Sequence, residues 1–352
     1  MIFKKTISIR RIVLFYIFIC MAVFVEFSPA IAQIKEARLK KIYSLSKDEL
    51  NVSGKELILS NPISFDFDKD GNLYVLDTGI HKIMKFDNKL RLVWEKGGKG
   101  PGPGEFSFPI DIYTGAFALS DSGELYVAEK FALRIQVFNN NGDFIRLFCR
   151  FPFMLEKGMA VDSNGNVYVH GDGNYRIYVF NKKGELIRSI VEPILKDSEA
   201  GFTYNAFSFT INKSGELFIA YTFFPILRKY NALGELLWEK RLDFKCLPRK
   251  VRKKLNSNTP LSYFLKHKHN IPENIRRRNP SLLQEITTDN GKIYILMLWS
   301  VIMELDSNGS PQKLYYIDED YGNSNLNICL RTNNKLFFLN TEGNIWILKE
   351  NN

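Results

Sequence analysis

The stretch "DFDKDGNLYVLD" at residues 66–77 carries acidic residues whose spacing could hold a metal ion. Asp66, Asp68 and Asp70 precede a glycine in the D-x-D-x-D-G order of a calcium-binding loop, whose twelfth position is usually a bidentate glutamate. That position is Asp77 here, and the flanking residues alternate as in β-strands. The same aspartates therefore also fit a hairpin turn that they stabilise. Both interpretations stay open, and Asp66 is a candidate metal ligand that could face a central channel.

Histidines offer a second candidate metal site. His81 and His170 follow similar apolar runs, so a repeated fold would set them near the same edge of two repeats. His267 and His269 lie in a basic segment, and neither pair has the spacing of a zinc site. No nucleophile–base pair is recognisable. We therefore expect no cofactor, with a metal at Asp66, His81 and His170 as the alternative.

The run "GGKGPGPGEFSFP" at residues 97–109 is rich in glycine and contains a lysine, as phosphate-binding loops do. A phosphate-binding loop of the Walker type needs Gly-Lys-Ser/Thr at the start of a helix. Here Gly100 follows Lys99 and no helical pattern comes after it. Pro101 and Pro103 also lack the backbone N–H groups that a phosphate would need. The run is therefore interpreted as a connector between two strands.

Residues 245–285 form a basic segment with eleven Lys and Arg against two Glu, a charge of +9. The whole chain carries +10, of which residues 1–32 contribute +3. The residues outside these two segments therefore have a net charge of −2. Thr259 and Pro260 suit a helix start, so we predict a small helical insertion. Its basic side chains are candidate contacts for an anionic ligand: Arg249, Lys250, Arg252, Arg276 and Arg277.

The elements that must position these residues are strands in a sixfold repeat. A glycine or asparagine turn precedes a short β-type run in each copy: "DGNLYVLD", "SGELYVAE", "NGNVYVHG", "SGELFIAY", "NGKIYILM" and "NNKLFFLN". A further run precedes each copy, another follows it, and a fourth strand follows in the first five. Four antiparallel strands repeated at this spacing predict an all-β, six-bladed β-propeller.

The sixth copy lacks its fourth strand, because the chain ends at Asn352. The run "RLKKIYSL" at residues 38–45 could pair with "NIWILKE" at residues 344–350 and close the ring. We therefore expect one propeller domain over residues 33–352, with the basic helical insertion between blades 4 and 5. A two-sheet sandwich is the alternative.

The sequence "GPGPGEFSFP…GELYVAEKFALRIQVFNNNGDF" resembles an NHL-type repeat. The resemblance covers residues 35–352 at the level of the fold, closely in the first three repeats and loosely in the last three. It implies a six-bladed propeller. NHL-like propellers include enzymes, such as metal-dependent lyases with histidines around the central metal, and binding modules, so the resemblance alone does not choose a function.

The N-terminus has the layout of a secretory signal peptide. Four Lys and Arg precede the apolar run at residues 12–25, and Ala30 and Ala32 give a cleavage pattern. This run is shorter than the roughly 20 residues of a spanning helix. We therefore predict a periplasmic or extracellular protein with no stable membrane span after cleavage of residues 1–32, with an uncleaved N-terminal anchor as the alternative. Nucleic acid is then an unexpected partner.

The function predicted from these patterns is binding of a protein or an anionic ligand. Connectors between blades share a face with the loops that join second and third strands, so the basic insertion should lie beside the aromatic residues of two such loops. The candidate contacts there are Tyr221, Phe223 and Trp299. The alternative is a metal-dependent lyase or lactonase with its site in the central channel.

Overall fold

The computed structural model describes residues 34–45, 51–52, 55–56, 59–108, 115–151, 155–171, 176–194, 205–242, 283–297, 301–317, 326–332, 335–340 and 345–350. Residues 1–35 and residues 36–352 form two compact units. The predicted signal peptide, residues 1–32, lies outside the described part. None of the described residues belongs to a helix that could cross a membrane.

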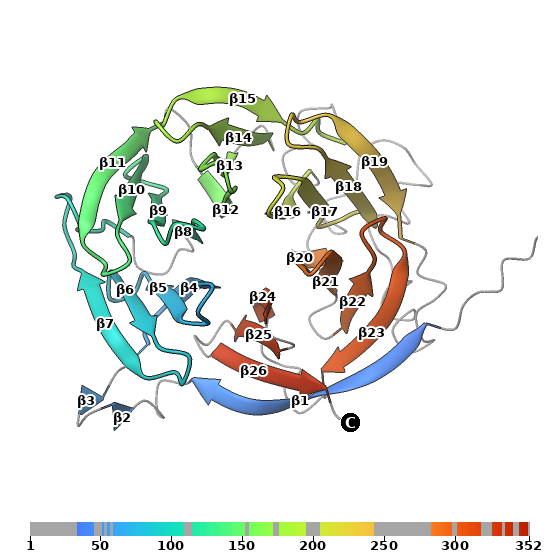
Figure 1. Ribbon diagram of the computed structural model, residues 1–352, viewed down its shortest axis with the longest axis horizontal. Helices are drawn as coiled ribbons and strands as arrows, with labels where there is room; N and C mark the ends of the chain where they lie inside the picture. The colour runs from blue at the N-terminus through green and yellow to red at the C-terminus, as the bar shows by residue number, and fades with distance from the viewer. Residues whose placement is uncertain are drawn as a thin grey trace, which may run out of the picture. The chain divides into compact units, whose positions relative to one another are not determined.

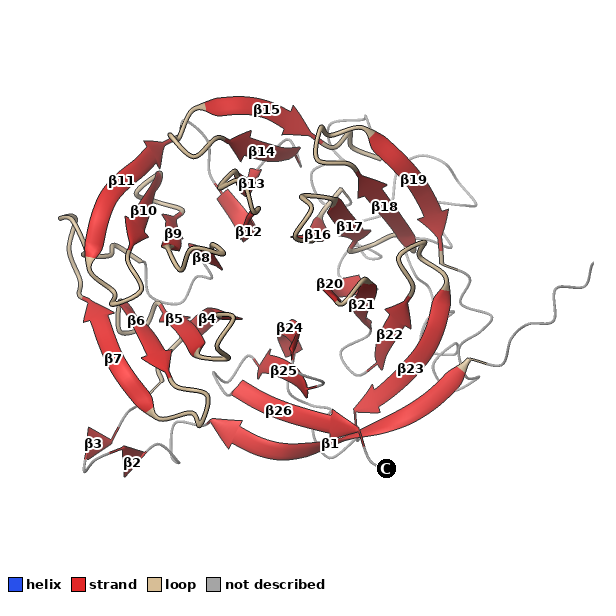
Figure 2. Cartoon of the chain, in the orientation of Figure 1, coloured by secondary structure: helices blue, strands red, loops and turns tan. Residues whose placement is uncertain are grey.

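The second unit is an all-β propeller (Figures 1 and 2). Blade 1 is β4 (Pro62–Phe67), β5 (Leu73–Asp77), β6 (Lys82–Phe86) and β7 (Leu92–Gly97), and blade 2 is β8 (Gly115–Leu119), β9 (Leu125–Glu129), β10 (Arg134–Phe138) and β11 (Phe144–Arg150). Blade 3 is β12 (Leu155–Val161), β13 (Val167–Gly171), β14 (Arg176–Phe180) and β15 (Leu186–Ile190). Blade 4 is β16 (Phe207–Ile211), β17 (Leu217–Tyr221), β18 (Ile226–Tyr230) and β19 (Leu236–Arg241). Blade 5 is β20 (Leu283–Asp289), β21 (Lys292–Met297), β22 (Val301–Leu305) and β23 (Pro311–Ile317).

The prediction of six separate blades is wrong, because the sheets contain five blades of four consecutive strands. The sixth repeat supplies only β24 (Leu326–Thr332), β25 (Lys335–Asn340) and β26 (Ile345–Glu350). These strands and blade 5 form one eight-stranded sheet, in the order β20-β21-β22-β23-β1-β26-β25-β24. The physical reason is β1 (Lys35–Leu45), whose 11 residues pair with a strand on each side.

The predicted pairing of the N-terminal strand with the last strand is confirmed. β1 and β26 are antiparallel, from Leu39 opposite Glu350 to Leu45 opposite Ile345. A short hairpin of β2 (Asn51–Val52) and β3 (Lys55–Glu56) follows β1. The side chain of Leu39 is 1% exposed and packs among Tyr315, Ile317 and Leu348 of both neighbouring strands.

The predicted helical insertion at residues 245–285 is also wrong, since the described residues contain no helix. Leu283 to Glu285 begin β20 and pair with β21, so the inner strand of blade 5 takes up the end of this segment. Residues 245–282 lie outside the described part of the chain.

The core lies along the second strand of each blade. Every residue of β5, β9, β13 and β17 is buried, because a strand inside a packed sheet contacts neighbours on both faces. The repeated aromatic residue of the sequence pattern fills this layer, with at most 3% of each side chain exposed: Tyr74, Tyr126, Tyr168, Phe218 and Tyr294. This packing holds the loops at both ends of the strands in fixed positions.

Candidate functional site on the connector face

The two faces of the propeller carry different loops. One face, here called the turn face, carries the turns between first and second strands and between third and fourth strands. The other, here called the connector face, carries the loops between second and third strands and the connectors between blades. This division follows from the antiparallel order of every blade.

On the turn face, the candidate calcium loop is a hairpin turn held by its own aspartate. The carboxylate of Asp68 accepts hydrogen bonds from the backbone N–H groups of Asp70 (3.0 Å) and Asn72 (2.9 Å). It also accepts one from the Asn72 side chain at 2.8 Å. Asp162 accepts the same set in blade 3. These contacts support the turn interpretation of the acidic stretch.

On the connector face, Asp77 fastens the chain that enters blade 1. Its carboxylate is fully buried and accepts hydrogen bonds from the backbone N–H groups of Ser60 (2.7 Å), Asn61 (2.9 Å) and Gly79 (2.9 Å). A carboxylate with this many backbone donors is committed to holding its loop. Asp77 is therefore a structural residue and not the twelfth ligand of a calcium loop.

The glycine-rich run joins β7 to β8, which confirms that it is a connector. It folds back on itself, with Phe106 N donating to Gly98 O at 2.8 Å and Gly100 N donating to Phe106 O at 3.1 Å. The Glu105 carboxylate packs against Gly100, where a Cβ atom would displace it. The run therefore has a defined conformation.

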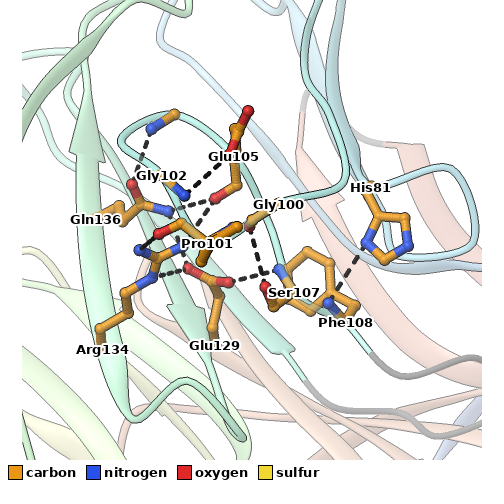
Figure 3. A network of polar contacts seen from close by, with 11 residues as sticks. His81, Gly100, Pro101, Gly102, Glu105, Ser107, Phe108, Glu129, Arg134 and Gln136 are labelled. Atoms are coloured by element: carbon orange, nitrogen blue, oxygen red, sulfur yellow. Dashed lines mark hydrogen bonds and ion pairs between the residues drawn. The ribbon is translucent and has the colours of Figure 1, made fainter.

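A buried ion pair between Glu129 and Arg134 of blade 2 holds this connector in place (Figure 3). Arg134 Nε lies 2.6 Å from Glu129 Oε1, and the two side chains are 7% and 0% exposed. The guanidinium also donates to Pro101 O at 2.6 Å and to Glu105 O at 2.9 Å. The three nitrogens of the planar guanidinium thus donate to three different acceptors. The pair thus ties blade 2 to the preceding connector.

Gln136 and Ser107 complete the network (Figure 3). Gln136 donates to Glu105 O and Glu129 Oε1, both at 2.9 Å, and its Oε1 accepts from Gly104 N at 3.0 Å. Ser107 N donates to Glu129 Oε2 at 2.8 Å. These polar groups satisfy one another's hydrogen-bonding capacity inside the protein and so hold the connector in position. The exposed side chain of Lys99 takes no part in this network.

The outer side of this region is basic and partly apolar. Lys99, which forms a β-bridge with Phe106 where the connector folds back, is exposed, and Phe131 in the neighbouring loop is 46% exposed. Arg150 ends β11 on the same face and is also exposed. Among the described residues, neither Lys99 nor Arg150 forms an ion pair. These three residues are candidate ligand contacts.

The histidines and Asp66 are each held in separate packing environments. The His81 ring stacks on Phe108 at 6.0 Å, and burial, followed by the charge of Lys99, lowers the pKa of His81. The His170 ring stacks on Phe207 at 4.1 Å. Burial raises the pKa of Asp66 to about 6, against the hydrogen bond that its carboxylate accepts from Phe67 N at 2.8 Å.

Groups of three or more His, Cys, Asp or Glu able to hold a metal ion are absent from the described ranges. Asp66, His81 and His170 therefore do not belong to such a group there.

Of the predicted aromatic contacts, Tyr221 is fully buried in blade 4. Its hydroxyl accepts a hydrogen bond from Arg228 Nη1 at 2.7 Å and donates to Glu192 O at 3.3 Å. Burial raises the pKa of Tyr221 well above its usual range. Phe223 is half-buried against the blade 4 core. The other predicted contacts lie outside the described residues: Trp299, Arg249, Lys250, Arg252, Arg276 and Arg277.

Sequence reasoning did not identify the network of Glu129, Arg134 and Gln136. A signal for it exists, since Glu129 ends the second strand and Arg134 begins the third, at the two ends of one short loop. The hydrogen-bond acceptors on the connector are backbone carbonyl groups, which every residue type has, so the sequence does not identify them. Only the folded path of residues 97–108 reveals them.

Comparison with known proteins supports the fold. No protein-family model matches the chain. NHL repeat-containing protein 3 of Mus musculus is 28% identical over 101 residues, which are 26% of this chain and 28% of that protein. The match thus spans less than a third of its length.

Two solved structures share the architecture at low identity. Virginiamycin B lyase from Staphylococcus aureus with quinupristin is 14% identical, with a TM-score of 0.54 and coverage of 91% of this chain and 97% of that chain. A streptogramin B lyase is 13% identical, with a TM-score of 0.50 over 86% of this chain and 81% of that chain. Identity at this level shows the fold alone. The chain is therefore a β-propeller, and 101 of its residues are similar at low identity to an NHL repeat-containing protein.

Proposed function

We propose that this protein is an exported binding module whose connector face binds a protein or an anionic ligand. The observation that carries the proposal is the fixed glycine-rich connector, which holds an exposed, unpaired Lys99 above a buried network. A loop already held in one conformation loses little entropy on binding, so its contacts contribute more to affinity.

The charge of this face favours an anionic surface on the ligand. Lys99 and Arg150 have no acidic partner among the described residues, and Phe131 adds an exposed aromatic ring on the same face. The basic segment predicted from the sequence leaves the outer strand of blade 4, and we propose that it extends the same basic face. Its proposed contacts are Arg249, Lys250, Arg252, Arg276 and Arg277, with Phe223 and Trp299 beside them.

Heparin, a soluble polyanion, is the probe for this proposal. We expect Lys99→Glu to weaken heparin binding several-fold and to reduce its dependence on salt, because charge pairing at an exposed site is screened by ions. Lys89→Glu is the matched control, since Lys89 is an exposed, unpaired lysine on the opposite turn face. Titration at several salt concentrations measures both effects.

Deletion of residues 245–282 tests the basic segment separately. A several-fold loss of heparin binding with an unchanged melting temperature supports its part in the proposal. Equal binding by the Lys99→Glu, Lys89→Glu and deletion variants would refute an anion site on the connector face.

A further inference from the structure

We propose that the outer edge of β11 binds an extended segment of a partner protein, which adds to blade 2 as a fifth strand. The segment carries an apolar residue toward Leu147 and acidic residues toward the basic side chains near Arg150. This inference rests on the proposed binding function, but it assigns a second surface, the rim of blade 2, which meets the connector face at Arg150.

The first observation is an open sheet edge. The strand order β11-β10-β9-β8 leaves β11 at the end of its sheet, and no other described strand pairs with its outer side. Such an edge presents backbone N–H and C=O groups that an extended peptide can bind.

The protein itself shows that the outer edge of a blade accepts another strand. β23 occupies the place of β11 in blade 5, and β1 follows it in the eight-stranded sheet. Both β11 and β23 have 7 residues. Each has a register shift near its first residues, between Val137 and Phe138 and between Glu304 and Leu305 on the paired strands, and β11 has a second shift, between Ile135 and Gln136, that β23 lacks. A bulge at this place is therefore compatible with strand addition.

One position separates blades 2 and 5 from the other blades. The third residue of the third strand lies opposite Leu147 in blade 2 and Leu314 in blade 5. The residue at the same register in blades 1, 3 and 4 is polar: Glu95, Ser189 and Glu239. Leu314, in the strand next to β1, is 0% exposed, whereas Leu147 is 42% exposed. Blades 2 and 5 thus share an apolar residue at this register, and only blade 5 has a described strand beside its outer edge.

Two further apolar side chains of β11 are exposed beside Leu147. Phe144 is 36% exposed and Ile145 is 45% exposed. The outer strands of blades 3 and 4 begin with a similar exposed pair, Leu186 and Ile187 in β15 and Leu236 and Leu237 in β19, so the third exposed apolar residue, Leu147, is what sets β11 apart. Burial of these three side chains would supply the apolar part of the binding energy.

Charge identifies the partner segment as acidic. The turn of blade 3 packs against β11, because a Cβ atom at Gly184 would collide with the carbonyl oxygen of Phe148. This contact places Gly184, which follows the exposed Lys182 and Lys183, beside Phe148, two residues before Arg150 in β11. None of these three basic residues forms an ion pair within the described chain. β1 carries Lys35, Arg38, Lys40 and Lys41 against Glu36, so a β1 strand from a second copy is a poorer match.

The test uses a short fluorescent peptide of alternating valine and aspartate, with anisotropy as the measurement. We expect the full chain to bind this peptide and Leu147→Glu to bind it about tenfold more weakly. Glutamate occurs naturally at this register in blades 1 and 4, so the variant should fold. Leu237→Glu is the control, since Leu237 is 50% exposed on the outer strand of blade 4. It should bind like the unaltered protein.

Two control peptides identify the mode of binding. A lysine–valine peptide should not bind, and a valine–aspartate peptide with N-methylated backbone amides should lose binding, because it cannot extend the sheet. Equal affinity for both variants, or binding that survives N-methylation, would overturn the proposal. So would self-association that Leu147→Glu abolishes, since the occupant would then be a second copy. Heparin binding through Lys99 should survive in Leu147→Glu, which separates this proposal from the proposed function.

Discussion

At the scale of single residues, Asp66 has the clearest consequence for stability. Burial raises its pKa from 3.8 to about 6, so the folded state prefers the protonated carboxyl more than the unfolded state does. Its contribution is therefore fully present below pH 3.8 and is lost as the pH rises through about 6. We expect stability to fall by up to about 3 kcal/mol over this window because of Asp66.

Asp66→Asn removes this titration and keeps one acceptor oxygen for the N–H group of Phe67, whereas its NH2 group replaces the oxygen that accepts from Leu119 N. Denaturant unfolding at pH 4 and pH 7 should give a smaller difference for the variant than for the unaltered protein. The lowered pKa of His81 acts in the opposite direction, since its contribution is lost as the pH falls below its usual value of 6.5. Only the difference between variant and parent is therefore diagnostic. An identical pH dependence in both would contradict the assignment.

The ion pair of Glu129 and Arg134 allows a second residue-scale prediction. Arg134→Met leaves a buried carboxylate without its cationic partner, which should lower the free energy of unfolding by about 3–5 kcal/mol. Arg146→Met is the control, because Arg146 pairs with Glu124 at 35% and 32% exposure and should contribute less than about 1 kcal/mol. Thermal unfolding measures both. Similar losses in the two variants would show that burial of the pair does not determine stability.

The sequence predicted the connector role of residues 97–108 but not its anchors. The prolines and the missing helix pattern excluded a phosphate loop by local chemistry alone. The anchors depend on where backbone carbonyls of Pro101 and Glu105 lie after folding. Tyr221 shows the same limit, since its neighbours in sequence do not reveal that Arg228 and Glu192 surround its hydroxyl.

At the scale of elements, strand periodicity predicted most strands and the pairing of β1 with β26. It did not predict that β1 also continues the sheet of blade 5. Whether β1 also pairs with the outer strand of blade 5 depends on the length of β1 and on its position around the ring. The alternation of apolar residues within a strand gives neither. The predicted helical insertion at residues 245–285 is wrong at residues 283–285, which belong to β20. Helix-cap residues are weaker determinants of structure there than the pairing of β20 with β21.

The double pairing of β1 makes Leu39 a test of this element. Leu39→Ala should lower the free energy of unfolding by about 2–5 kcal/mol, because its side chain is buried between β23 and β26. Denaturant unfolding measures the loss. Val93→Ala is the control, since Val93 is 55% exposed on the outer strand of blade 1 and should have little effect. Equal effects would contradict a stabilising role for the β1 seam.

At the scale of the whole molecule, the metal content separates a binding module from a metal-dependent lyase. We expect purified residues 33–352, prepared without chelators or a metal-binding tag, to hold no stoichiometric metal by mass spectrometry. Asp68 and Asp77, which the acidic stretch offers as ligands, already accept several backbone hydrogen bonds, and a metal would compete with those bonds. A tightly held metal in every chain would contradict this expectation. It would favour the lyase alternative and direct mutagenesis to Asp66, His81 and His170, whose alanine variants should then lose the metal.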